Sequence, residues 1–173
     1  FVKKNMCGSV AYVGSRRAYP ILIKGLQRLE YRGYDSAGIG LIEDNKIVTY
    51  KKDGKVNDLI SFIGDSSTDG TIGIGHTRWA THGPPNQINS HPHSSSNGRF
   101  SLIHNGIIEN YLTLKIALEK KGHVFISDTD SEVLIHLIED VYNSLEKKSV
   151  SNNDLLYQAI IIALNEVIGA YAI

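Results

Sequence analysis

The sequence contains a single cysteine, Cys7, which follows Met6 and precedes Gly8. A lone cysteine is most often a small buried hydrophobic residue. Here, however, removal of Met6 and the residues before it would give Cys7 a free α-amine. Such an amine has an ordinary pKa of about 8 and can act as a general base near neutral pH. Cys7 is therefore a candidate nucleophile that would carry its own base.

A second group of reactive side chains lies in the segment His76-Thr-Arg-Trp-Ala-Thr-His-Gly83, which follows an apolar run. Arg78 offers a planar pair of donors that matches a carboxylate, and Thr81 and His82 could add hydrogen bonds. A solvated loop with a packed tryptophan is the alternative. The segment is thus suggestive of a carboxylate clamp without establishing one.

A third group begins at His104-Asn-Gly-Ile-Ile-Glu-Asn110. The pair Asn105-Gly106 is most often a turn. It could instead form an oxyanion hole, in which the asparagine NH₂ and the glycine N–H stabilise one developing negative charge. Asp130 opens a predicted helix, where a carboxylate is favourable in the first turn. The same carboxylate could bind an ammonium group such as the α-amine of an amino acid.

The seven histidines raise the question of a metal site. His91-Pro-His93, together with His76 and His82, could be arranged around zinc. No carboxylate or second cysteine lies at ligand spacing, and the pattern matches no structural zinc motif. The sequence therefore predicts neither a metal site nor a cofactor. The pair Gly73-Ile-Gly75 is too short for a phosphate-binding loop and lacks its lysine.

Regular elements must position these groups, and both strand and helix patterns are present. Alternating or apolar runs predict strands at Ser9–Val13, Gly38–Ile42, Ile47–Tyr50, Thr71–Gly75, Phe100–Ile103 and Ala170–Ile173. Helical spacing predicts helices from Pro20 to Leu29, Val56 to Ile63, Tyr111 to Leu118, Thr129 to Leu145 and Asp154 to Val167. The last is apolar nearly all round, which predicts burial on more than one side. Strands without strict alternation with helices indicate the α+β class.

The composition narrows the class of function. The 173 residues suit one domain, and 18 basic residues balance 18 acidic ones, so no charge excess indicates a nucleic-acid partner. The longest apolar run, from Ala159 to Leu164, is far shorter than the roughly 20 residues that span a bilayer. One cysteine allows no intramolecular disulfide. We expect a cytoplasmic domain that acts on small molecules.

Taken together, six segments resemble the glutaminase domains of glucosamine-6-phosphate synthases (glutamine:fructose-6-phosphate amidotransferases). They occur in the order of that family, cover nearly the whole chain and form a specific set. The segments are Cys7-Gly8, Leu29-Glu-Tyr-Arg-Gly-Tyr-Asp-Ser-Ala-Gly38, Gly75-His-Thr-Arg-Trp-Ala-Thr-His-Gly83, Asn89-Ser-His-Pro-His93, His104-Asn-Gly-Ile-Ile-Glu-Asn110 and Asp128-Thr-Asp-Ser-Glu132.

The resemblance implies an N-terminal-nucleophile (Ntn) hydrolase fold, an αββα sandwich of two antiparallel sheets between helical layers. It also implies roles for individual residues. Cys7 would attack the glutamine amide while Asn105 and the N–H of Gly106 hold the oxyanion. The substrate α-carboxylate would bind Arg78, Thr81 and His82, and its α-amine would bind Asp130. Trp79 would help to control ammonia passage, and Arg32 lies in the segment around the nucleophile.

The resemblance further implies that residues 1–6 are a leader, tag or processed segment and that residues 7–173 form a glutaminase domain truncated at its C-terminal end. Ammonia would reach fructose-6-phosphate on an isomerase domain absent from this chain, and the full-length enzyme would be a homo-oligomer. Ser9 departs from the branched aliphatic residue usual in the family, so we expect a modest packing effect there. Two alternatives stay open: another class II amidotransferase, or a glutamine-binding module without turnover.

Overall fold

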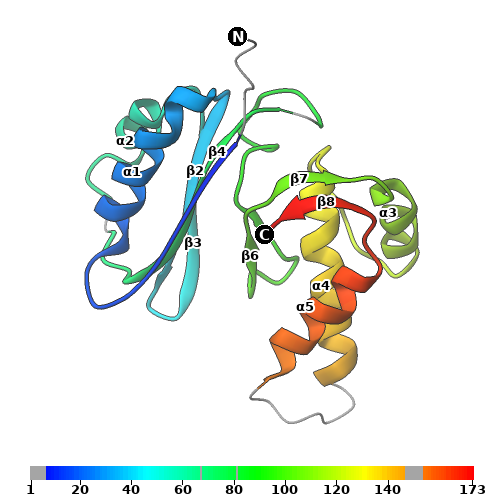
Figure 1. Ribbon diagram of the computed structural model, residues 1–173. Coiled ribbons are helices and arrows are strands. Elements are labelled where there is room, and N and C mark those ends of the chain that lie inside the picture. Colours follow the sequence, from blue (N-terminus) through cyan, green and yellow to red (C-terminus); the bar gives the residue numbers. More distant parts are fainter. Residues whose placement is uncertain (1–6, 67, 81, 147–153) are drawn as a thin grey trace.

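The computed structural model describes residues 7–66, 68–80, 82–146 and 154–173. Figure 1 shows helices α1 and α2 on one side of a large sheet and α3, α4 and α5 on the other side, with short strands between. The mixture of helices and antiparallel strands confirms the predicted α+β class. Among the described residues, none of the helices is long and apolar enough to cross a membrane.

The large sheet has four antiparallel strands in the order β1-β4-β2-β3. Its strands are β1 (Gly8–Val13), β2 (Ser36–Glu43), β3 (Lys46–Asp53) and β4 (Ile72–Arg78). The predicted hairpin is confirmed: β2 and β3 pair from Ser36 opposite Asp53 to Glu43 opposite Lys46. Asp44 and Asn45 make the turn with φ of 48° and 59°, a conformation that these two residue types tolerate well.

Helices α1 (Ala18–Leu29) and α2 (Val56–Ile63) cover one face of this sheet and enclose its core, and the 3₁₀ turn η1 (Glu30–Arg32) follows α1. Leu22 and Leu26 of α1 are fully buried, and each contributes about 1.5–3 kcal/mol through removal from water. Gly73 and Gly75 of β4, which the sequence analysis excluded as a phosphate loop, allow α1 to pack closely against the sheet. A Cβ on Gly73 would lie 2.9 Å from Leu22, and one on Gly75 would lie 3.2 Å from Leu26.

The other face of the sheet meets a second layer of short strands. They pair antiparallel as β5 (His93–Ser94) with β6 (Ser101–Leu102), and as β7 (Asn105–Ile108) with β8 (Gly169–Ala172). The second sheet of the predicted sandwich therefore consists of two separate pairs within the described residues. Helices α3 (Tyr111–Lys120), α4 (Asp130–Glu146) and α5 (Leu155–Asn165) form the outer layer, with a second core.

Strand β4 extends further than the sequence predicted. The expected strand stopped at Gly75, whereas β4 continues to Arg78 and keeps its pairing with β2 as far as Ser36 opposite Arg78. Because side chains alternate along a strand and Gly75 faces α1, His76 and Arg78 point toward the second layer. This extra length places both side chains in the space between the layers.

Helix α4 begins where the predicted capping box places it, but only half of the box forms. The Glu132 N–H donates to Thr129 Oγ1 at 3.3 Å. The Glu132 carboxylate reaches past Thr129 and accepts the N–H groups of Ile126 at 3.0 Å and Ser127 at 2.7 Å. Glu132 therefore attaches the preceding loop to the first turn of α4.

The prediction that α5 is buried on more than one side is wrong. The helix packs against α4 and buries one stripe, Leu155, Ala159 and Ala163. Ile160 and Leu164 are partly buried beside this stripe. The remaining apolar side chains are exposed, with relative exposures of 41–66% at Leu156, Tyr157, Ile161 and Ile162. An apolar cavity of about 260 Å³ separates α5 from β2 and β4. The helix is as apolar as predicted, but no neighbouring layer of the described residues covers its outer side.

Candidate active site

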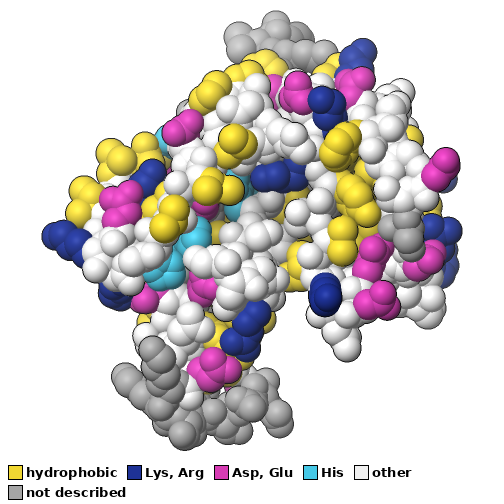
Figure 2. Space-filling model, turned by 180° about the vertical axis from the view of Figure 1, so that it is seen from behind, with side chains coloured by type: hydrophobic (Ala, Val, Ile, Leu, Met, Phe, Trp, Pro, Cys, Tyr) yellow, Lys and Arg dark blue, Asp and Glu magenta, His cyan; other side chains and the backbone are white. Residues whose placement is uncertain are grey.

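A cavity of about 830 Å³ lies between the two layers, where β1, β4 and β7 meet the beginning of α4. On the face shown in Figure 2, histidine and basic side chains come together near the middle of the molecule, between the two lobes. The cavity contains every described residue that the sequence predicted for the site: Cys7, Arg32, Arg78, Trp79, His82, Asn105, Gly106 and Asp130. Thr81 lies outside the described residues.

Cys7 sits at the entrance to β1, opposite the end of β4. The Trp79 N–H donates to Cys7 Sγ at 3.2 Å, and the thiol donates to the Trp79 carbonyl at 3.6 Å. Burial raises the pKa of the Cys7 thiol above its ordinary value, and the Asp35 carboxylate acts in the same direction. The Trp79 N–H and Arg78 act against this shift without cancelling it. The thiol is therefore protonated at neutral pH and needs a base to become a nucleophile.

Asn105, at the start of β7, is held from two sides. His76 Nε2 lies 2.8 Å from Asn105 Oδ1, and Asn105 Nδ2 donates to Ser9 Oγ at 2.7 Å. Burial lowers the pKa of His76 to about 4, so the ring is neutral and Nε2 donates to the amide oxygen. Since Cys7 and Ser9 are two residues apart on extended backbone, they share a face. Asn105 therefore directs its NH₂ toward the side of β1 that carries Cys7.

Gly106 follows Asn105 at a position that requires glycine. Its φ is 133°, which side chains rarely allow. A Cβ at this position would lie 2.2 Å from the Ala170 carbonyl oxygen and 2.6 Å from Tyr171 Cα, both on β8. The absence of a side chain thus permits the close β7–β8 pairing and leaves the backbone of Gly106 open to the cavity.

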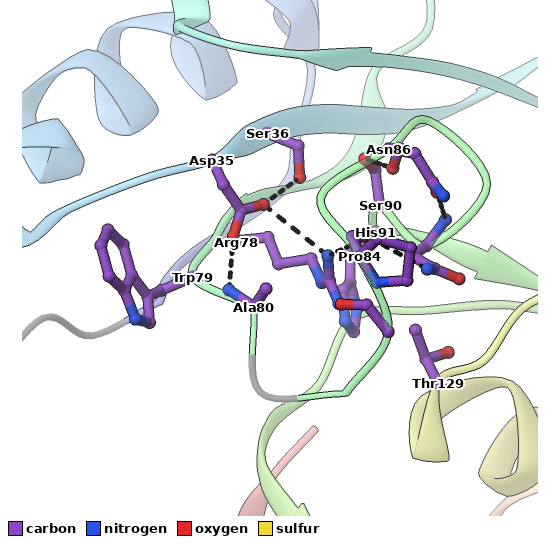
Figure 3. Close-up of polar contacts among 12 residues, drawn as sticks. Asp35, Ser36, Arg78, Trp79, Ala80, Pro84, Asn86, Ser90, His91 and Thr129 are labelled. Atoms are coloured by element: carbon purple, nitrogen blue, oxygen red, sulfur yellow. Dashed lines mark hydrogen bonds and ion pairs between the residues drawn. The ribbon is translucent and has the colours of Figure 1, made fainter.

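Arg78 is buried at the end of β4, with 4% relative exposure. Its guanidinium donates to the carbonyls of His82, Gly83 and Pro84. On the other side, Nη1 lies 3.7 Å from Asp35 Oδ1 (Figure 3). The fork that could bind a carboxylate is therefore already surrounded by oxygen acceptors of the chain.

Asp130 occupies the first turn of α4, also almost fully buried. Its Oδ2 accepts the Ile108 N–H of β7 at 2.9 Å. Its Oδ1 faces two imidazoles, 3.7 Å from His82 Nδ1 and 4.0 Å from His104 Nδ1. One carboxylate oxygen thus fixes β7 to α4, while the other points to the cavity.

Three of the four histidines considered for zinc, His76, His91 and His93, pack together in the core, whereas His82 lies beside Asp130. The ring centroids of His76 and His91 are 4.2 Å apart, and those of His91 and His93 are 4.9 Å apart. His91 Nδ1 accepts the His104 N–H at 3.3 Å, and His91 Nε2 lies 3.3 Å from Ser131 Oγ. Burial lowers the pKa of His91 well below 6.5 and that of His93 to about 3. These rings are neutral and form hydrogen bonds within the protein.

Comparison with known proteins identifies the family to which this chain is similar. A family profile described as a glutamine amidotransferase domain matches residues 64–149. The chain is 58% identical over 169 residues to a glutamine–fructose-6-phosphate aminotransferase (isomerizing) of Bacteroides thetaiotaomicron, and 52% identical over 168 residues to that of Thermus thermophilus. The chain belongs to the glutamine amidotransferase family. Each alignment covers 97% of the chain, which spans 26% of the length of these relatives.

The fold of this amidotransferase domain also matches a solved structure. The phosphoribosylpyrophosphate amidotransferase of B. subtilis superimposes with a TM-score of 0.77 and 32% sequence identity. The match covers 96% of this chain and 34% of that one. The similarity supports the predicted Ntn type of fold.

Sequence reasoning missed three side chains that hold the site of this amidotransferase domain. Asp35 lies beside Arg78, and its Oδ2 accepts the Ala80 N–H. His76 and Ser9 hold the amide of Asn105. Asp35 and His76 lie within the segments that carried the family resemblance, and Ser9 was noted only as a departure from the family. Their partners lie 29 to 96 residues away in sequence, so local patterns gave no signal of these contacts.

Trp79 and Arg32 line the same cavity at its edge. The Trp79 indole is 40% exposed and points away from the Arg78 guanidinium in Figure 3. Arg32 ends the 3₁₀ turn η1, directly after α1. Both side chains therefore line the same space as Cys7 and Arg78.

Proposed function

We propose that this domain hydrolyses the side-chain amide of glutamine to glutamate and ammonia, with Cys7 as the nucleophile. The observation that carries the proposal is the shared cavity: the thiol, the Asn105–Gly106 pair, a buried arginine and a buried carboxylate line one space. Membership of the glutamine amidotransferase family supports glutamine as the substrate. A nucleophile, anion donors and two opposite charges are what an amino-acid amidase requires.

The base in this proposal is the α-amine of Cys7 itself. Six residues precede Cys7 in the printed sequence, so the proposal requires their removal. The need for a base follows from burial, which raises the pKa of the thiol. An α-amine with an ordinary pKa of about 8 is matched to this task near neutral pH.

The reaction would proceed in two steps. Cys7 Sγ attacks the amide carbon and passes its proton to the α-amine, and the resulting oxyanion is bound by Asn105 Nδ2 and the N–H of Gly106. The carbon–nitrogen bond then breaks, and ammonia leaves with the proton from the amine. Water hydrolyses the γ-glutamyl thioester, which releases glutamate and restores the thiol.

Substrate binding would use the two buried charges. The α-carboxylate of glutamine would bind Arg78 with the help of Thr81 and His82, and the α-amine would bind Asp130 Oδ1. Because the carbonyls of His82 and Gly83 now occupy the guanidinium, an incoming carboxylate would replace them there. The segment after β4 would therefore move when glutamine binds.

The ammonia would serve the conversion of fructose-6-phosphate to glucosamine-6-phosphate in the cytoplasm. This step of the proposal rests on the two aminotransferases that are 58% and 52% identical to the chain. The sugar would bind to a part of the protein that this chain does not include. Trp79 and Arg32, at the cavity edge, would guide the ammonia and shield the nucleophile.

Glutamate release is the direct test. A chain that begins at Cys7 should release glutamate and ammonia from glutamine in equal amounts, and Cys7→Ala should release neither. Retained glutamine binding in Cys7→Ala would show that the substitution leaves the fold intact. Glutamine binding without turnover in the unsubstituted trimmed chain would favour a binding module. Amination of phosphoribosylpyrophosphate instead of fructose-6-phosphate by the full-length protein would favour another class II amidotransferase.

A further inference from the structure

We propose a metal-binding site outside the catalytic cavity, formed by His123, His136 and Glu139. His123 lies in the segment between α3 and α4, and the other two residues lie on α4. One ligand atom from each of the three lies within 4.8 Å of the other two. Two imidazoles and one carboxylate form a ligand set that suits zinc and related divalent transition ions and leaves one position open.

The two imidazoles approach each other with their Nδ1 atoms. His123 Nδ1 lies 3.2 Å from His136 Nδ1, and His136 Nδ1 lies 3.7 Å from Glu139 Oε2. Ligands about 2.1 Å from a tetrahedral zinc are separated by about 3.4 Å. The distances from His136 Nδ1 to its two neighbours are thus close to those between ligands around one ion, and all three ligand atoms lie within 4.8 Å of one another.

The opposite nitrogen of each ring supplies a second, independent observation. His136 Nε2 lies 3.7 Å from Glu132 Oε1, and His123 Nε2 lies 3.6 Å from Asp140 Oδ1. Histidines that bind metals commonly direct their other ring nitrogen to a carboxylate, which fixes the ring and strengthens the ligand. Both histidines of this cluster have a carboxylate on that side, at a distance slightly longer than a hydrogen bond.

The surroundings favour a cation. Three carboxylates, those of Glu132, Glu139 and Asp140, surround the two rings. Two cations act on them: Lys121 Nζ lies 2.6 Å from Asp140, and Lys51 interacts with Glu132. His136 and Glu139 are nearly fully buried. A divalent ion would balance the excess of negative charge where water cannot screen it well.

The site is supported and accessible. Glu139 is held by the N–H groups of Ser96 at 2.9 Å and Asn97 at 3.1 Å. Ser96 Oγ, 2.9 Å from His136 Nδ1, would release that nitrogen when the ion binds. A cavity of about 490 Å³ reaches His136 from the surface between β3 and the segment after α3.

The proposed ion would stabilise the fold and take no part in amide hydrolysis. It would fasten the segment around His123 to α4, the helix whose first turn carries Asp130. A ligand that binds only the folded state raises the free energy of unfolding in proportion to the logarithm of its concentration. Zinc should therefore raise the unfolding temperature even in a chain without a working nucleophile.

Cobalt is the appropriate probe, because Co²⁺ occupies zinc sites and absorbs visible light. The titration should use the chelator-treated Cys7→Ser chain, which has no thiol to compete for the ion. We expect binding of one Co²⁺ per chain, displacement by Zn²⁺ and a higher unfolding temperature with either ion. Absence of stoichiometric binding would overturn the proposal, because the hydrogen-bonded cluster would then need no ion.

Variants locate the site. His123→Asn, at a side chain that is 12% exposed, should abolish the visible spectrum while circular dichroism shows a folded chain. Asp140→Asn should weaken Co²⁺ binding by about ten- to a hundredfold, the usual effect of losing the carboxylate behind a histidine ligand. Glu146→Gln, an exposed carboxylate on the same helix, is the matched control for Glu139→Gln and should bind normally. Binding that survives His123→Asn and Glu139→Gln would contradict the assignment.

Discussion

The side-chain amide of Asn105 can point its NH₂ in one direction only, because a neutral His76 occupies its oxygen. If the NH₂ binds the oxyanion, Asn105→Ala should lower kcat for glutamine hydrolysis by about a hundred- to a thousandfold. KM should change far less, because the oxyanion exists only after attack. Steady-state glutaminase kinetics measure both constants.

Asn105→Asp is the matched control, since it keeps the shape and replaces the donor by an acceptor. The two variants should lose kcat to a similar degree. A variant with normal turnover would exclude Asn105 from oxyanion binding.

The position of Arg78 leads to a prediction about glutamine binding, which should change more than the turnover rate. Asp35 lies beside its guanidinium and also accepts the Ala80 N–H. Asp35→Asn removes the charge and keeps the size, so Arg78 should lose its fixed orientation. We expect KM for glutamine to rise roughly tenfold, the equivalent of one charged hydrogen bond, with a smaller change in kcat. An unchanged KM would show that Asp35 does not position Arg78.

At the scale of single residues, the sequence identified the side chains that line the cavity better than the side chains that support them. Cys7, Arg78 and Asn105 could be proposed from residue chemistry and family resemblance together, and the structure brings them to one cavity. Ser9, Asp35 and His76 act through contacts across the fold. Such contacts depend on strand register, which the sequence alone did not give.

At the level of elements, the β7–β8 pair depends on Gly106. Gly106→Ala would place a Cβ against the Ala170 carbonyl and impose a φ of 133° on alanine. We expect a loss of a few kcal/mol of unfolding free energy, from the clash and the backbone strain together. Urea denaturation of the two proteins measures the difference.

Gly98→Ala is the matched control, because Gly98 also has a positive φ, 70°, but no atom lies within 4 Å of its added Cβ. It should lose only about 1 kcal/mol, the usual effect of replacing a left-handed glycine. Equal losses in the two variants would mean that the close approach to β8 contributes nothing.

The predicted boundaries of helices and strands agree with the structure where the local sequence pattern is strong. Helix α2 matched its prediction from Val56 to Ile63, because amphipathic spacing is bounded by Gly64. The pair β5–β6 has only two residues in each strand, which is too short for a sequence period. The burial of α5 was overestimated because apolar composition shows what a helix could bury and not which neighbour is present to cover it.

At the level of the whole molecule, buried neutral histidines join the two layers. Burial lowers the pKa of His76 to about 4 and that of His93 to about 3, whereas in the unfolded chain both titrate near 6.5. Below about pH 6.5 the unfolded chain therefore binds protons at these two histidines, whereas the folded chain does not. The free energy of unfolding should fall as the pH drops from about 6.5 toward 4.

Urea midpoints between about pH 7 and pH 5 test this dependence, and His93→Gln should reduce its slope because one titrating ring is removed. Because folding lowers the pKa of these histidines, their full contribution to the free energy of unfolding is present above the pKa of the unfolded chain and is lost as the pH falls. Stability that stays constant over this range would mean that these rings are not held neutral by burial.

The central claim is that Cys7 attacks a glutamine-like carbon once its own amine is free. Intact-mass analysis after reaction with diazo-oxo-norleucine tests it most directly. We predict one adduct on Cys7 in a folded chain that begins at this residue, and none in Cys7→Ala or in the chain with the preceding residues attached. A trimmed, folded chain that gains no adduct, or gains it elsewhere, would contradict the account.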